Sequence, residues 1–184
     1  MTTVLRMPIR SMSSSVMEDL QKTYPDAEVE VNVGASAGMP EARFWELIAL
    51  LDWSQTNDDE AVIGPLVATL AAGPVREIYE FQDWLSAKLY ALDIQVFAEQ
   101  TGEDAYQPDT YFSVDIFLYA RCCVIANGRA AYEQVLQNPV EIPKDLTFET
   151  LLYVASEAYE RKTGKSFSYV PTFSIETYSN HQGW

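Results

Sequence analysis

The chain has 184 residues, of which 48% are hydrophobic and 12% aromatic, so it can bury the core of a single domain. It carries 27 acidic and 12 basic side chains, which gives a formal net charge of −15. This charge argues against a general nucleic-acid binder and against a protein of anionic membrane surfaces. It favours solubility and attraction to a basic partner.

The composition also bears on the compartment. No apolar run approaches the roughly 20 residues of a membrane-spanning helix, and no signal-peptide core is found. Arg6 and Arg10 lie in an acid-poor start that could resemble a transit peptide, but the helix and strand expected directly after them favour folded structure. The two cysteines, Cys122 and Cys123, are adjacent, and a disulfide between them would close no useful loop. We therefore expect a reducing cytoplasm.

The first residues predict a small module. A short strand over 2–10 and a helix over 13–24 precede a stretch over 27–33 in which valines alternate with polar residues, as in a half-buried strand. We therefore expect a β-α-β-like module over 1–33, with Glu28 and Glu30 on its outer face. The edge of the strand over 27–33 could pair with the same strand of a second copy and form a homo-oligomer. Residues 34–38 predict a linker, and 39–184 a second domain.

Three helices are predicted at the start of this domain. Apolar residues at helical spacing predict a helix from Pro40 to about residue 53. A second helix over 57–73 begins with Asn57 and Glu60 in a capping box, and Gly64-Pro65 should bend or split it. A third, long helix is predicted over 74–101.

The second half predicts three more helices and a tail. Residues 113–128 are apolar almost all round and predict the central buried helix, with a buried strand as the competing interpretation. A shorter helix follows over 132–137, and Asp145 is expected to cap a last helix that ends at Gly164. Beyond it, alternating residues predict an extended segment laid on the helices or, alternatively, an edge strand. The expected class is mainly α (α+β), a compact bundle of about six helices.

Few residues can carry catalysis or bind a metal. Cys122, Cys123 and His181 are the complete set of cysteines and histidines, too few for a closed zinc site, so we expect no metal. A Ser-His or Cys-His pair would have to use His181. The phosphate-binding, dinucleotide-binding, nucleophile-elbow and calcium-loop motifs are absent, and no cofactor is expected.

Asp93 and Arg121 are the charged residues that stand out. Asp93 lies between core positions of the predicted long helix, and Arg121 lies in the most apolar stretch of the chain. Because a buried charge is costly unless it is paired, we expect the two side chains to contact each other. The pair would be a structural ion pair or, alternatively, the catalytic pair of a hydrolase or transferase.

Several motifs occur together in one order: Phe-Trp-Glu-Leu-Ile at 44–48, Ile-Phe-Leu-Tyr-Ala-Arg at 116–121, Val-Ile-Ala-Asn-Gly at 124–128, Ala-Tyr-Glu-Arg-Lys-Thr-Gly at 158–164 and Glu-Thr-Tyr-Ser-Asn at 176–180. With them, the chain from about 39 to 184 resembles the bacterial domain-of-unknown-function family DUF4240. The resemblance implies a small, mainly helical domain without an established activity. It places the following residues at recurrent motif positions: Trp45, Asp93, Arg121, Asn127, Gly128 and Trp184.

Two classes of function remain open. The first is a non-enzymatic protein-binding domain, such as an immunity- or antitoxin-like inhibitor of a basic partner. Its candidate binding residues are the acidic side chains of the first module and of the loop after the long helix: Glu28, Glu30, Glu103, Asp104 and Asp109. The second is an enzyme that uses Asp93 and Arg121. We expect a protein as partner, and neither nucleic acid nor a membrane.

Overall fold

The computed structural model describes Glu18, residues 22–23, 38–55 and 57–184. The chain divides into two units, Met1–Ser36 and Ala37–Trp184, and the second is considered by itself below. The β-α-β-like module predicted over 1–33, with Glu28 and Glu30, falls almost entirely outside the described residues.

The second unit is helical, as predicted. Its described residues form seven α-helices and three 3₁₀ helices and contain no strand. The stretch over 113–128 is a helix, so the competing interpretation as a strand is wrong. The α-helices are α2 (Glu41–Ile48), α3 (Asp59–Ala72), α4 (Val75–Ala91), α5 (Gln95–Ala98), α6 (Val114–Ala126), α7 (Gly128–Gln137) and α8 (Val154–Thr163), and the 3₁₀ helices are η2 (Trp53–Gln55), η3 (Pro139–Glu141) and η4 (Glu149–Tyr153).

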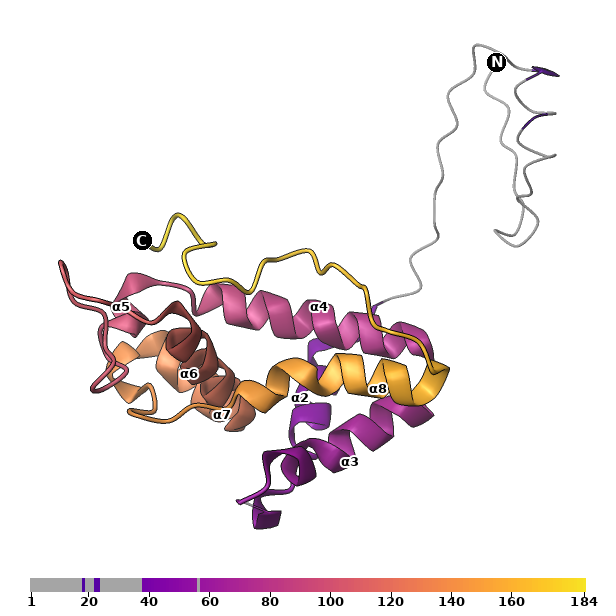
Figure 1. The fold of residues 1–184 in the computed structure, drawn as a ribbon, viewed down its shortest axis with the longest axis horizontal. Coiled ribbons are helices and arrows are strands. Elements are labelled where there is room, and N and C mark those ends of the chain that lie inside the picture. Colours follow the sequence, from indigo (N-terminus) through magenta and orange to yellow (C-terminus); the bar gives the residue numbers. More distant parts are fainter. Residues whose placement is uncertain (1–17, 19–21, 24–37, 56) are drawn as a thin grey trace. The chain divides into compact units, whose positions relative to one another are not determined.

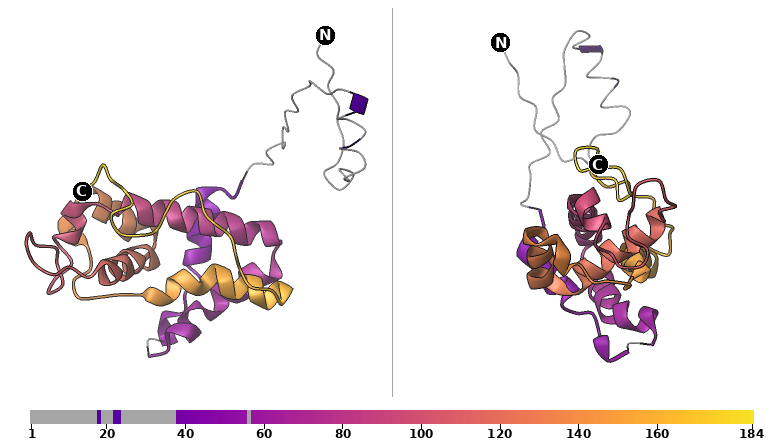
Figure 2. Two further views of the ribbon diagram at one scale, coloured as in Figure 1. Left: turned by 45° about the horizontal axis from the view of Figure 1, so that its top comes forward. Right: turned by 90° about the vertical axis from the view of Figure 1, so that its left-hand side faces the viewer.

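The helices pack into a compact bundle around one core. Helix α8 lies against α3 and α4, while α6 lies against α4 and α7 (Figures 1 and 2). Helix α6 is buried over most of its surface, which agrees with its apolar sequence. Large apolar side chains of the core come from α2, α3, α4 and α6 and are fully buried: Phe44, Leu66, Phe81, Leu89 and Phe117.

Helix α3 differs from its prediction in two details. Its N-cap is Asp58 and not Asn57, and the Asp58 carboxylate accepts a hydrogen bond of 3.0 Å from the backbone N–H of Ala61. The helix continues through Gly64-Pro65, so the predicted split is absent. Packing of α3 against α8 offsets the backbone hydrogen bond that Pro65 cannot donate.

The long helix predicted over 74–101 is interrupted. Helix α4 ends at Ala91, Ile94 is extended at φ −136° and ψ 138°, and α5 begins at Gln95. Asp93 therefore lies in a break between two helices. The backbone N–H of Gln95 donates a hydrogen bond of 2.8 Å to the carbonyl of Gly183, so the end of the chain satisfies a group that the break leaves free.

Asp145 does not cap the last helix, contrary to the prediction. It is left-handed at φ +55°, and its carboxylate accepts a hydrogen bond of 2.6 Å from the N–H of Glu103. A Cβ atom on Gly102, which has φ +102°, would collide with this carboxylate. The last helical segment starts instead with η4 and continues as α8, which ends at the left-handed Gly164 as predicted.

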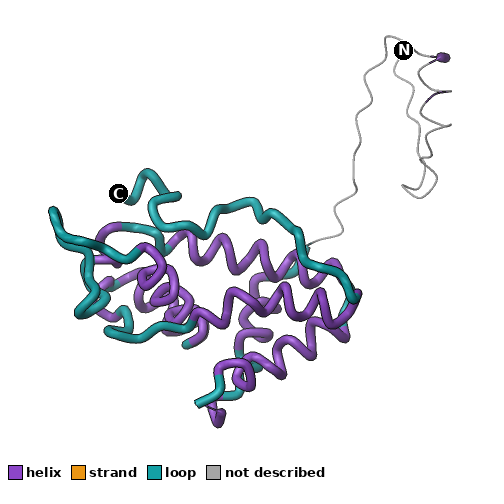
Figure 3. Tube along the Cα trace, viewed as in Figure 1, coloured by secondary structure: helices purple, strands orange, loops and turns teal. Residues whose placement is uncertain are grey.

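Residues 165–184, the C-terminal strap, contain no helix or strand. The strap returns along α4 from the end of α8 and finishes near α5 and α6, as the loop-coloured tube shows (Figure 3). None of its residues is fully buried. The prediction of an extended segment on the helices is confirmed, and the alternative of an edge strand is wrong.

Candidate functional site

The break between α4 and α5 places the carboxylate of Asp93 beneath the strap. Asp93 is fully buried and accepts four hydrogen bonds, all from strap residues. Its Oδ1 accepts from the N–H of Tyr178 at 3.1 Å and from Nε1 of Trp184 at 3.0 Å. Its Oδ2 accepts from the N–H of Asn180 at 2.9 Å and from the hydroxyl of Ser179 at 3.3 Å. The buried charge is thus satisfied by donors and not by a cation.

The strap closes tightly around this carboxylate. Tyr178 has a left-handed backbone conformation at φ +71°. This turns the chain so that the backbone amides of Tyr178 and Asn180 both face Asp93. The side-chain amide of Asn180 donates to the carbonyl of Tyr90 at 3.2 Å. A Cβ atom on Gly183 would lie 2.7 Å from Cγ1 of Ile94, so this close approach requires glycine.

Arg121 of α6 holds the strap from the other side. Its Nη1 donates to the carbonyl of Leu89 at 3.0 Å, and its Nη2 donates to the carbonyl of Ile175 at 3.1 Å and to the hydroxyl of Thr177 at 2.9 Å. The guanidinium lies 4.8 Å from the ring centre of Phe117. Burial lowers the pKa of Arg121 to about 10, although the negative charge of Asp93 opposes this shift.

The predicted contact between Asp93 and Arg121 is wrong. Both side chains are fully buried, as the sequence indicates, but no hydrogen bond or ion pair within 4.0 Å joins them. Each binds the strap instead, because the strap offers both N–H donors and carbonyl acceptors. Two open cavities near Trp84 and Pro74 are lined by neither residue. As folded, the pair presents no atom to a substrate.

Aromatic side chains surround the end of the strap. The indole of Trp184 lies 4.4 Å from the ring of Tyr178, 5.6 Å from Tyr106, 5.9 Å from Phe117 and 6.1 Å from Phe112, measured between ring centres. These rings come from the strap itself, from the loop after α5 and from α6. Trp184 therefore combines an aromatic contact with the hydrogen bond to Asp93.

A second carboxylate on α4 binds the middle of the strap. Asp83 Oδ2 accepts from the hydroxyl of Tyr169 at 2.7 Å, and Oδ1 accepts from the N–H of Thr172 at 3.3 Å. The hydrogen bond to Asp83 raises the pKa of Tyr169 to about 12. Asp83, on α4, and Asp93, just beyond the end of α4, thus hold the strap at two places.

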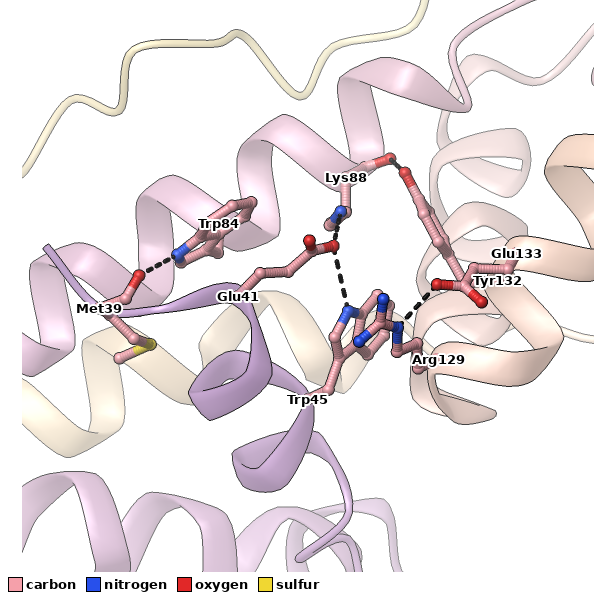
Figure 4. A network of polar contacts seen from close by, with 8 residues as sticks. All are labelled: Met39, Glu41, Trp45, Trp84, Lys88, Arg129, Tyr132 and Glu133. Atoms are coloured by element: carbon pink, nitrogen blue, oxygen red, sulfur yellow. Dashed lines mark hydrogen bonds and ion pairs between the residues drawn. The ribbon is translucent and has the colours of Figure 1, made fainter.

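A separate cluster, the Lys88 cluster, joins α2, α4 and α7 (Figure 4). The ammonium of Lys88 pairs with the carboxylate of Glu41, which also accepts from Nε1 of Trp45 at 3.3 Å. The same ammonium lies 5.7 Å from the ring of Trp45, 5.2 Å from Trp84 and 5.1 Å from Tyr132. Three cation–π contacts and one ion pair fix the position of this lysine.

The interactions of the Lys88 cluster hold the three helices together. The hydrogen bond from Lys88 lowers the pKa of Glu41, and burial raises the pKa of Tyr132. Of these residues only Trp45 was predicted from the sequence, as a motif position, and four were not: Glu41, Trp84, Lys88 and Tyr132. The spacing of Trp84 and Lys88 on one face of α4 was the available local signal.

The remaining motif positions are structural. The side-chain amide of Asn127 donates to the carbonyl of Cys123 at 2.8 Å and so closes the end of α6. Gly128, at φ +89°, turns the chain directly into α7. The two cysteines are free and buried, and burial raises the pKa of Cys122 to about 12.

The predicted acidic loop residues lie on the surface. Glu103, Asp104 and Asp109 are exposed, and their carboxylates form no hydrogen bond or ion pair with the described part of the chain. Between Lys88 and Arg121 the sequence has six acidic residues and no lysine or arginine. No positive side chain of this stretch can neutralise them.

Searches of the described residues identified neither a metal site nor a membrane span. No group of three or more His, Cys, Asp or Glu side chains among them is arranged to hold a metal ion. None of the described helices has the length and apolar character needed to cross a membrane.

The fold and these contacts define a helical domain whose C-terminal strap is bound by buried charges. The chain belongs to the family of proteins of unknown function DUF4240, whose model matches residues 39–161. The match includes Asp93 and Arg121 and ends before the strap. No curated protein and no solved structure matches the sequence.

Proposed function

We propose that this domain is a non-enzymatic protein-binding domain that recognises a basic partner, in the manner of an immunity- or antitoxin-like inhibitor in the cytoplasm. The observation that carries the proposal is the set of exposed carboxylates at Glu103, Asp104 and Asp109, which have no basic neighbour in the sequence from 89 to 120. Unpaired surface charge attracts a partner of opposite charge and accelerates association.

Five acidic side chains elsewhere in the domain differ from these three. The ion pairs among the described residues involve carboxylates of α2, α4 and α7: Glu41, Glu46, Glu77, Glu80 and Glu133. Those carboxylates already have cationic partners within the chain. The loop carboxylates remain available for the basic groups of another protein.

Exposed apolar side chains accompany the acidic loop. Tyr111 is 92% exposed, Val96 43% and Val114 39%. Tyrosine is frequent at the centres of protein interfaces, where its ring supplies contact area at a small entropic cost. A tyrosine among unpaired carboxylates fits a partner surface that is basic and has a shallow apolar depression.

The test compares two triple charge reversals in the full chain. The partner is captured from the native host with the wild-type chain and identified by mass spectrometry. We expect Glu103→Lys, Asp104→Lys and Asp109→Lys together to slow its association at least about tenfold at low salt. The matched control reverses Asp59, Glu60 and Glu160, which are exposed and distant in sequence from the loop. Association that is independent of salt and equal for both triple variants contradicts the proposal.

The N-terminal module adds a second element to this proposal. It would pair with the module of another copy, and Glu28 and Glu30 would be further acidic binding residues. Light scattering of the full chain and of a shortened chain that starts at Met39 measures this self-association. The same number of chains per particle for the full and the shortened chain would exclude it. The enzymatic alternative rests on Asp93 and Arg121, and their burial under the strap gives it no support.

A further inference from the structure

The helices hold the strap in the way that proteins hold an extended peptide. Asp93 accepts from the backbone amides of Tyr178 and Asn180, and Arg121 donates to the backbone carbonyl of Ile175. Asp83 accepts from the amide of Thr172. These four contacts are directed at main-chain groups of the strap, as in complexes of domains with extended peptides.

Two aromatic side chains of the strap supply anchors. Trp184 lies among the rings of Tyr106, Phe112 and Phe117, and Phe167 packs against the core with its ring 5.9 Å from that of Tyr79 on α4. An anchor side chain in an apolar setting, next to main-chain hydrogen bonds, is the usual basis of peptide affinity. We call the surface of α4, α5, the loop after α5 and α6 that contacts the strap the strap-binding face.

The strap is less firmly built into the fold than the helices. None of its residues is fully buried, and the fully buried apolar side chains among the described residues end at Ala158. Among the described residues, one backbone–backbone hydrogen bond joins the strap to a helix, from Gln95 to Gly183. Segments with few buried contacts open at a lower free energy than the whole domain.

We propose that the strap-binding face is a peptide-binding site and that the strap of a second copy of this chain can occupy it. A second strap brings the same amides, carbonyls and indole to Asp93, Arg121 and Asp83, so the contacts are equal to those seen within one chain. The exposed residues Gly164 to Ser166 connect the strap to α8 and serve as its hinge. This inference is independent of the proposed partner of the acidic loop.

The test weakens the strap of the full chain and supplies the segment in trans. Trp184→Ala removes the hydrogen bond to Asp93 and the aromatic anchor but leaves the strap-binding face intact. The probe is a fluorescent peptide with the sequence of residues 167–184. We expect this peptide to bind the variant at least about tenfold more tightly than it binds the wild type, whose own strap competes at a high effective concentration.

Two controls make the result specific. A peptide that carries Trp184→Ala should bind the variant at least about tenfold more weakly than the unchanged peptide. The full-chain variant Trp53→Ala removes a tryptophan that is 45% exposed and packs on Phe148, away from the strap, and it should bind the peptide no better than the wild type does.

The outcome that overturns the proposal is a Trp184→Ala variant with native helical circular dichroism that fails to bind the unchanged peptide or binds both peptides equally. If this variant loses its helical signal, Trp184→Phe replaces it, because phenylalanine keeps the aromatic contact and removes only the hydrogen bond. A mixture of Trp184→Ala with Asp93→Asn then tests exchange between full chains. We expect light scattering to detect a heterodimer that neither variant forms alone, and its absence would contradict the exchange.

Discussion

The indole Nε1 of Trp184 donates a hydrogen bond of 3.0 Å to Oδ1 of Asp93 and so joins two residues 91 positions apart. The aspartate is in a break between two helices, and the tryptophan is in a segment without regular structure. This single contact fixes where the strap meets the bundle. Its energetics can be measured by substitutions on either side.

Asp93→Asn should destabilise the domain by about 3 kcal/mol. The side-chain NH2 of asparagine is a donor, and it would face strap groups that donate hydrogen bonds to the carboxylate of Asp93. Chemical denaturation followed by circular dichroism measures the change. Asp104→Asn makes the same chemical replacement at an exposed, unpaired position and should change the free energy of unfolding by less than about 0.5 kcal/mol. Equal effects of the two substitutions would show that the four hydrogen bonds to Asp93 contribute nothing.

Lys88→Met keeps most of the lysine stem and removes its charge. We expect a loss of about 1–2 kcal/mol in the free energy of unfolding at neutral pH, from the cation–π contacts and the ion pair with Glu41. The pKa of Glu41 is lowered in the folded state, so its stabilising effect is present above the ordinary pKa and disappears as the pH falls through the lowered value. The difference between variant and wild type should therefore shrink in acid, and a constant difference would contradict the role of Glu41.

Gly102→Ala and Gly128→Ala separate two costs of a left-handed position. Both glycines have positive φ, 102° and 89°, but a Cβ atom would collide with the Asp145 carboxylate only at Gly102. We expect about 1 kcal/mol of destabilisation at Gly128 from the backbone alone and at least twice that at Gly102. Adding Asp145→Ala should recover part of the loss at Gly102 and none at Gly128. Thermal unfolding of the four variants tests this ordering.

The two cysteines should resist thiol reagents in the folded protein. Burial raises the pKa of Cys122 to about 12 and also raises the pKa of Cys123, so few thiolates form at pH 8. Reaction with a coloured disulfide reagent should require denaturant and then proceed at the rate of unfolding. Rapid labelling of one thiol in native buffer would mean that α6 is accessible near its end.

Glu157 of α8 is expected to lower the stability of the domain at neutral pH. Burial is the main cause that raises its pKa, and the charges of Glu60 and Glu160 raise it further. Because its pKa is higher in the folded than in the unfolded chain, stability decreases as the pH rises through that range. Glu157→Gln should therefore stabilise the domain slightly at pH 7, by less than about 1 kcal/mol since the side chain is exposed. The gain should vanish below about pH 4, and a gain that persists there would exclude an electrostatic cause.

The buried residues were predictable from local sequence, and their partners were not. Asp93 and Arg121 are surrounded by apolar residues in the sequence, which indicates their burial. Apart from the carbonyl of Leu89, their hydrogen-bond partners are strap residues between 175 and 184, and no local pattern sets the alignment of an extended segment on helices. The general rule that buried charges are paired suggested the wrong pair, because backbone groups can satisfy them equally well.

The break at Asp93 and the Lys88 cluster were missed for a related reason. Residues 92–94 contain neither glycine nor proline, and the apolar spacing of α4 continues across them, so nothing local predicts an end. The break is stabilised by Gly183, far along the chain. Likewise, Glu41, Lys88 and Tyr132 come together only when three helices pack.

The uneven distribution of ion pairs has a consequence for the response to salt. The ion pairs among the described residues join side chains of α2, α4 and α7, whereas no carboxylate from 89 to 120 takes part in one. Added ions screen attraction and repulsion alike. Rising ionic strength should therefore loosen the packing of α2 on α4 and, at the same time, relax the mutual repulsion in the loop that follows α5.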